Sequence, residues 1–148
     1  PSLEITMSDF YKYFKENMED LGLIAPPQSL YGTQALAIST ISTILAYIDK
    51  FGTKVTVREL AGAGTRLEGL AVLGALGAAY YAGAVIGSLA VATGRTMSDG
   101  TSMADVFYEV SKRGWSRTWL RSLFHRRPGL YNASLSGRKY IKHYENYK

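Results

Sequence analysis

The chain has 148 residues, no cysteine, two histidines and a formal net charge of +5. This length favours a single domain that buries a core of its own. The lack of cysteine excludes disulfides and thiolate metal sites, and His125 and His143 are too far apart in sequence to predict a zinc site. We expect neither a metal nor a cofactor.

The charge is distributed unevenly along the chain. Residues 1–60 carry five Lys or Arg and seven Asp or Glu, residues 61–111 carry two and four, and residues 112–148 carry ten and one. A basic C-terminal third on a mildly acidic body indicates a polyanionic partner, which could be anionic lipid, an acidic protein or nucleic acid.

The N-terminal residues predict an amphipathic helix. Ser8 can cap a helix that begins at Asp9, Gly22 can end it, and Pro26 and Pro27 enforce the break. The first residues show no basic stretch followed by an apolar run, so we expect cytoplasmic synthesis without a cleaved signal peptide. Export would then use a leaderless route that ends at a target membrane.

The next segment, Gln28–Ile48, has 21 residues without a charge and predicts a long helix. The connector that follows contains Thr56-Val57-Arg58-Glu59, which fits a capping box and predicts a helix start, although alternating valines leave a short strand open. The same residues resemble the opening of a helix-turn-helix. The segment that would read DNA, however, has no basic residue between Arg66 and Arg95.

The segment Gly69–Gly94 is free of charge and rich in glycine and alanine, and we predict that it forms one helix. At ~1.5 Å per residue such a helix is long enough to cross the ~30 Å core of a bilayer. Small residues recur along it at four-residue steps, as they do where two helices pack closely. The helix-packing positions predicted here are Gly74, Gly77, Gly83 and Gly87.

Two alternatives for this segment stay open. A buried core helix of a soluble bundle would show the same pattern. A phosphate-binding loop at Gly62-Ala63-Gly64 is the weaker alternative, because a third glycine at the required offset and a following Gly-Lys-Ser/Thr are missing.

The C-terminal third predicts short helices at Ser102–Lys112 and Trp115–Phe124, followed by a polar helix in residues 131–148. Tryptophans beside basic residues are typical of a helix that lies on an anionic membrane surface. The alternatives are tryptophans that anchor the core beneath a solvated basic face, and a nucleic-acid site. The predicted anionic-surface residues are Lys112, Arg113, Trp115, Arg117, Trp119, Arg121, Arg126 and Arg127.

The sequence contains little that predicts catalysis. Asp105 and Glu109 are four residues apart and could form an acid–base pair, but Asp105 also suits the first turn of a helix. His125 could contact a phosphate. We predict no catalytic residues and no enzyme.

Taken together, these patterns predict an all-α fold in one domain: a compact helical bundle around a central uncharged helical hairpin. Its parts are an N-terminal amphipathic helix (1–27), the hairpin with its charged connector (28–95) and a basic aromatic region (96–148). The composition and spacing of residues 28–127 resemble small bacterial membrane-active effectors, which include pore-forming interbacterial toxins and the hydrophobic hairpin of pore-forming colicins.

That resemblance implies a protein that inserts its hairpin and permeabilises a target membrane. It also implies anionic lipid as a partner, an accompanying immunity or chaperone protein, and a chain that could oligomerise. The alternative function is a soluble helical interaction module whose basic C-terminal region binds an acidic protein or, with less support, nucleic acid.

Overall fold

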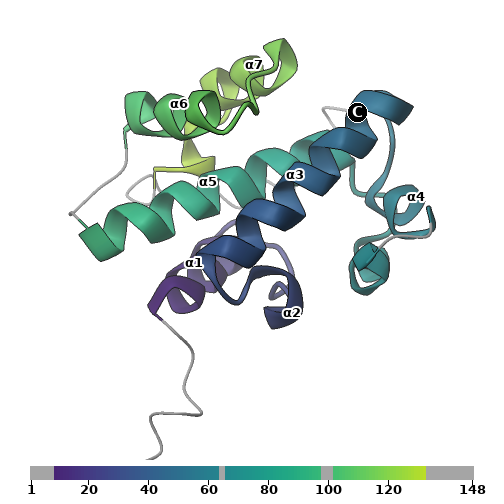
Figure 1. Cartoon of the computed structure of the whole chain (residues 1–148), viewed down its shortest axis with the longest axis horizontal. Coiled ribbons are helices and arrows are strands. Elements are labelled where there is room, and N and C mark those ends of the chain that lie inside the picture. The colour runs from purple at the N-terminus through teal and green to yellow at the C-terminus, as the bar shows by residue number, and fades with distance from the viewer. Residues whose placement is uncertain (1–8, 64–65, 98–101, 133–148) are drawn as a thin grey trace, which may run out of the picture.

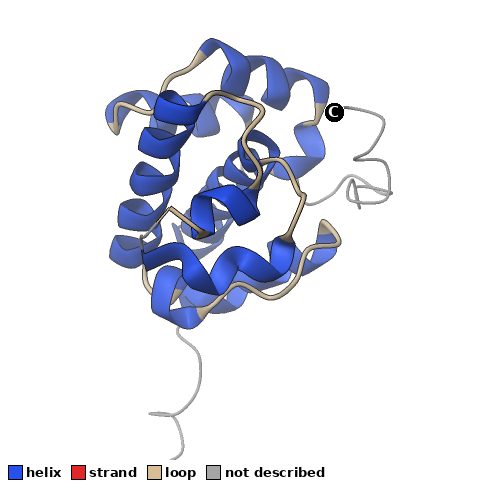
Figure 2. Ribbon diagram, turned by 90° about the vertical axis from the view of Figure 1, so that its right-hand side faces the viewer, coloured by secondary structure: helices blue, strands red, loops and turns tan. Residues whose placement is uncertain are grey.

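The structure is a computed structural model that describes residues 9–63, 66–97 and 102–132. The described residues form helices joined by short loops (Figures 1 and 2), so the all-α prediction is confirmed. The elements in chain order are α1 (Asp9–Asp20), α2 (Gln28–Tyr31), α3 (Gln34–Phe51), α4 (Val57–Ala61), the 3-10 helix η2 (Arg66–Leu73), α5 (Ala78–Met97), α6 (Met103–Lys112), α7 (Thr118–Arg126) and the 3-10 helix η3 (Pro128–Leu130).

Helix α5 lies at the centre of the bundle. Every residue from Tyr81 to Ala92 is buried, and the helix contacts α1, α3, α4, α6, α7 and η3. In Figure 1, α6 and α7 lie above α5, α1 and α2 lie below it, and α4 lies at one end. The stretch from Tyr81 to Ala92 carries no charge, and it can be enclosed in this way because none of its side chains has to keep contact with water.

The prediction of one continuous helix from Gly69 to Gly94 is wrong. Residues Arg66–Leu73 form the 3-10 helix η2, a turn follows, and α5 starts only at Ala78. Gly74 adopts a positive φ of +58°, which ends η2, and Gly77 pairs with Thr56 in an isolated antiparallel bridge. Gly74 and Gly77 are therefore turn and bridge residues rather than helix-packing positions.

The physical reason is that the connector offers this backbone better partners than a helix would. The main-chain N–H of Val57 donates to Leu76, the N–H of Arg58 donates to Gly74, and the N–H of Ala78 donates to Val55, at 2.8 to 3.0 Å. Glycine in a helix interior costs about 0.8–1 kcal/mol relative to alanine, so a Gly-rich segment leaves the helix readily when other hydrogen bonds are available.

The predicted helix at Gln28–Ile48 is also divided. A single turn, α2, is followed by Gly32, and α3 begins after Thr33, whose hydroxyl accepts a 3.1 Å hydrogen bond from the N–H of Leu36. Gly52 ends α3 with a φ of +99°. In the described part of the chain, no helix combines the length and the apolar character needed to cross a membrane.

Two local predictions are confirmed. The described residues from Asp9 to Asp20 form the predicted helix, α1, and the chain turns at Gly22, which has a positive φ of 89°. Thr56 and Glu59 form the predicted capping box of α4, and the bonds from Thr56 lower the pKa of Glu59. The helix-turn-helix resemblance fails beyond α4, because the next described element is the 3-10 helix η2.

Two buried polar contacts hold the layers around α5. Asn17 of α1 donates to the hydroxyl of Ser88 on α5 at 2.9 Å and to the carbonyl of Leu130 at 3.1 Å. Between α5 and α2, Tyr81 donates to the hydroxyl of Tyr31 at 2.9 Å, and burial raises the pKa of both phenols. These bonds join segments that are 50 to 113 residues apart in sequence.

Candidate functional site

The basic region predicted from the sequence forms a helical hairpin, α6–α7, on one side of the bundle. Helix α6 begins with a capping box in which the Ser102 hydroxyl accepts from the N–H of Asp105 and the Asp105 carboxylate accepts from the N–H of Ser102. Glu109 pairs with Arg113 at 2.7 Å and with Lys112 at 3.5 Å. The two acids considered for catalysis are thus engaged in helix capping and ion pairing.

Trp115 is a core residue. It lies in the loop after α6, where Gly114 has a φ of +75°, and its side chain is only 3% exposed. Its indole N–H donates to the hydroxyl of Ser42 on α3 at 3.0 Å. The prediction of a helix that begins at Trp115 is therefore wrong at its start, since α7 begins at Thr118.

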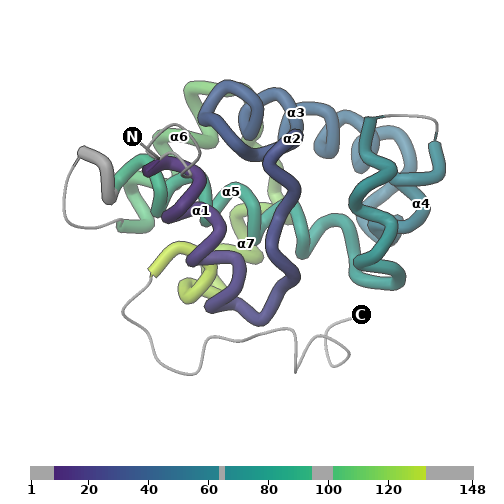
Figure 3. The backbone as a smooth tube through the Cα atoms, turned by 90° about the horizontal axis from the view of Figure 1, so that it is seen from below, coloured from purple at the N-terminus to yellow at the C-terminus, as the bar shows by residue number. Residues whose placement is uncertain are grey.

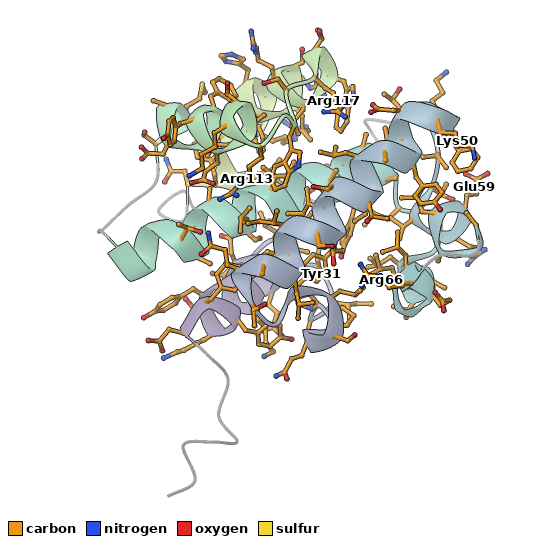
Figure 4. The ribbon with its side chains drawn as sticks, viewed as in Figure 1. Tyr31, Lys50, Glu59, Arg66, Arg113 and Arg117 are labelled. Atoms are coloured by element: carbon orange, nitrogen blue, oxygen red, sulfur yellow. The ribbon has the colours of Figure 1, made fainter. Side chains whose placement is uncertain are left out.

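Arg117 connects the start of α7 to the end of α3. Its Nε and Nη2 atoms donate to the two carboxylate oxygens of Asp49 at 3.0 and 2.6 Å, and its Nη1 atom donates to the carbonyl of Gly114. This bidentate bond lowers the pKa of Asp49 and raises the pKa of Arg117. Figure 4 shows Arg117 and Arg113 in the layer that α6 and α7 form.

The outer face of α7 carries the cations that remain available. Arg121, His125 and Arg126 are exposed, and within the described residues Arg121 and Arg126 have no acidic side chain in ion-pair distance. The guanidinium of Arg121 lies 5.8 Å from the ring centre of Phe107. Arg127 is half-buried and donates to the Arg126 carbonyl.

A cleft of about 230 Å³ opens between α6 and α7. Phe107, Val110, Leu120 and Phe124 form its apolar part, and Phe124 and Val110 are buried in the core. The polar part consists of Ser111, Ser116, Arg117 and Arg121. The cleft therefore joins an apolar floor to hydroxyl and guanidinium groups at its edge.

The inner side of the hairpin rests on the small residues of α5. A Cβ atom on Gly83 would lie closer than 3.0 Å to a methyl group of Leu123 on α7. A Cβ atom on Gly87 would lie equally close to the carbonyl oxygen of Leu130 in η3. Gly83 and Gly87 thus stand where α7 and η3 approach the backbone of α5.

The predicted anionic-surface set is divided by the fold. Arg113, Lys112 and Arg117 have carboxylate partners, Trp115 is buried and Arg127 is half-buried. The members that remain are the exposed Arg121 and Arg126 and the half-buried Trp119. The remaining bases of the tail, and the helix predicted in it, lie beyond Asn132 and outside the described residues.

Sequence reasoning did not find Asp49 and Ser42 as parts of this region. Asp49 lies 68 residues before Arg117, and Ser42 lies 73 residues before Trp115. Both belong to α3, whose sequence predicts only an uncharged helix and the residues that close it. A lone acid at the end of an uncharged helix was a weak signal that it has a distant cation as partner.

No three His, Asp or Glu side chains gather where they could hold a metal ion in the part of the chain that the structure describes. Comparison with protein-family models, with curated proteins and with solved structures finds no match for this chain.

Proposed function

We propose that the protein is a membrane-active bacterial effector that stores its uncharged central helix inside a closed bundle and opens on an anionic membrane. The observation that supports this best is the complete burial of α5 from Tyr81 to Ala92 beneath helices from both ends of the chain. Enclosure by amphipathic helices is how a lipid-seeking segment is kept away from water.

The α6–α7 hairpin is the element that would open. Its ion pair with α3 is exposed, with half of the Asp49 side chain accessible, and pairs of this kind contribute about 0–1 kcal/mol. Arg121 and Arg126 point outward, and a base near an anionic leaflet gains about 1 kcal/mol. An anionic surface would thus attract the face of the hairpin opposite to the one that covers α5.

Insertion would need more than α5 alone, because Ala and Gly add little hydrophobicity. In the proposed membrane state the turn at Gly74 straightens, so that residues 69–94 form one long helix. The small residues Gly83 and Gly87, released from Leu123 and Leu130, then pack against a neighbouring helix of the same or another copy.

A crosslink across the opening contact tests this function. The natural chain has no cysteine, so Asp49→Cys with Arg117→Cys provides one specific pair for a short thiol-reactive bridge. Dye leakage from phosphatidylglycerol vesicles should occur with the unbridged double variant and stop after bridging. Either single-cysteine variant treated with the same reagent is the matched control. Equal leakage from bridged and unbridged protein, or none from the natural chain, would refute the proposal.

A second candidate function is an interaction module whose basic C-terminal region binds an acidic protein or nucleic acid. It is favoured by two exposed arginines of α7, Arg121 and Arg126, which have no acidic partner among the described residues. An electrophoretic mobility shift assay on DNA and RNA at increasing salt concentration tests nucleic-acid binding, because phosphate contacts weaken steeply as salt rises. Absence of salt-sensitive binding would exclude the nucleic-acid form of this function.

A further inference from the structure

The cleft between α6 and α7 has the composition of a protein docking site. Its floor is formed by Phe107 and Phe124, whose ring centres are 6.4 Å apart in an edge-on arrangement, together with Val110 and Leu120. Its edge bears the hydroxyls of Ser111 and Ser116 and two guanidinium groups, those of Arg117 and Arg121.

The size of the cleft sets what it can hold. Its volume of about 230 Å³ exceeds the ~150 Å³ of an apolar cavity that accepts benzene, so one aromatic ring or one leucine side chain fits. Anchors of this kind, inserted in a pocket near the centre of a contact, supply most of the affinity in protein interfaces. The cleft is therefore large enough for one anchor and too small for an extended ligand.

The positive charge at the edge of the cleft favours a negatively charged group beside that anchor. Arg117 already holds Asp49 through two hydrogen bonds, whereas the guanidinium of Arg121 has no acid beside it among the described residues. Residues 102–132 contain six Lys or Arg and two acids, so the segment that forms the cleft has a net positive charge. A carboxylate next to the anchor would form a salt bridge with the guanidinium of Arg121.

We propose that this cleft is the docking site of an acidic protein segment, which inserts one aromatic or leucine side chain into the cleft against the half-buried ring of Phe107 and places a carboxylate on Arg121. This inference rests on the second proposed function, of which it gives the partner class and the contact residues. Such docking needs no membrane, so it can hold whether or not the bundle opens on lipid.

The test is a selection of random peptides displayed on phage against the intact chain. Enriched peptides should combine Asp or Glu with an aromatic residue or leucine. Their affinity should fall at least about tenfold for Arg121→Glu, which reverses the charge at the edge, and for Ser116→Trp, which fills the cleft from an exposed position. Both substitutions are at exposed residues, and circular dichroism checks that the variants keep the fold.

Arg126→Glu is the matched control, because it makes the same charge change on the same helix outside the cleft. Peptide affinity for this variant should stay within a factor of about two of the natural chain. Enriched peptides that are neutral or basic, no enrichment, or equal loss with Arg126→Glu would overturn the docking site.

Two further outcomes separate this inference from the functions above. If phosphatidylglycerol vesicles or DNA lose binding with Ser116→Trp but not with Arg126→Glu, the cleft takes lipid or nucleic acid, and the inference is overturned. If no acidic peptide is selected while DNA still binds in a salt-dependent manner, the interaction module stands and only the cleft assignment fails.

Discussion

Replacement of Gly87 by alanine tests how closely the C-terminal segment packs on α5. A Cβ atom at this position would lie closer than 3.0 Å to the carbonyl oxygen of Leu130, a separation that real Cβ atoms essentially never show. The same carbonyl accepts a 3.1 Å hydrogen bond from Asn17. Main chain cannot swing aside as the end of a side chain can, so η3 must move away from α5 and weaken this bond.

The size of the effect follows from three contributions. Overpacking of a well-packed contact costs about 1–3 kcal/mol. A weakened buried hydrogen bond costs about 1 kcal/mol more, and the better helix propensity of alanine returns about 0.8–1 kcal/mol. We expect Gly87→Ala to lower the free energy of unfolding by about 2 kcal/mol and the melting temperature by roughly 4–8 °C.

Urea denaturation followed by circular dichroism measures this loss, and Gly83→Ala is the matched control. There the added Cβ meets a methyl group at the end of the Leu123 side chain, which can rotate, so we expect a loss under about 1 kcal/mol. Gly83→Leu, in contrast, must displace both Leu123 and Leu130 and should destabilise more than either alanine variant. A Gly87→Ala protein as stable as the natural chain would refute the close packing of η3 on α5.

Three further predictions concern the ion pair, the phenol pair and the buried indole. Because the bond from Arg117 lowers the pKa of Asp49, its contribution is present above the ordinary Asp range and is lost as pH falls through the lowered pKa. Asp49→Asn should remove this loss of stability at low pH and should lower the free energy of unfolding by less than about 1 kcal/mol at neutral pH. Curves of stability against pH, from urea denaturation, that are identical for the variant and the natural chain would contradict this prediction. Burial raises the pKa of Tyr31 and Tyr81, so their contribution to stability should be fully present below the ordinary pKa of 10.0 and should decrease as pH rises above it. Ultraviolet titration of the folded protein measures this, and ionisation of both phenols near pH 10.0 would refute the prediction. Trp115→Ala should cost about 3–5 kcal/mol by urea denaturation, and a loss below about 1 kcal/mol would show that the indole does not anchor the hairpin.

The elements that could be predicted from the sequence are those fixed by hydrogen bonds within one turn. The capping box of Thr56 and Glu59 and the start of α6 after Ser102 both depend on residues no more than a few positions apart. Each side chain that caps a helix lies within three residues of the N–H from which it accepts, so both partners can be identified in the local sequence.

The candidate site could be predicted only in part. Clustering of bases and aromatic residues in 112–127 singles out this segment, but it does not indicate which of its members face outward. Trp115 turned inward because Ser42 accepts its N–H, and Arg117 became half of a salt bridge because Asp49 lies at the end of α3. Neither partner could be identified without knowing how α3 lies against α7.

The sequence by itself determined the all-α class and an uncharged run that gains by leaving water, but it left open whether this run is buried in a bundle or enters a bilayer. Seen from below in Figure 3, α1 and α7 lie along the central α5, and α4 lies at its far end. Only the tertiary structure decided where the uncharged run stops being a helix. The backbone of Val55, Val57 and Arg58 competes for the hydrogen bonds of residues 74–78, and no pattern within the run records that competition.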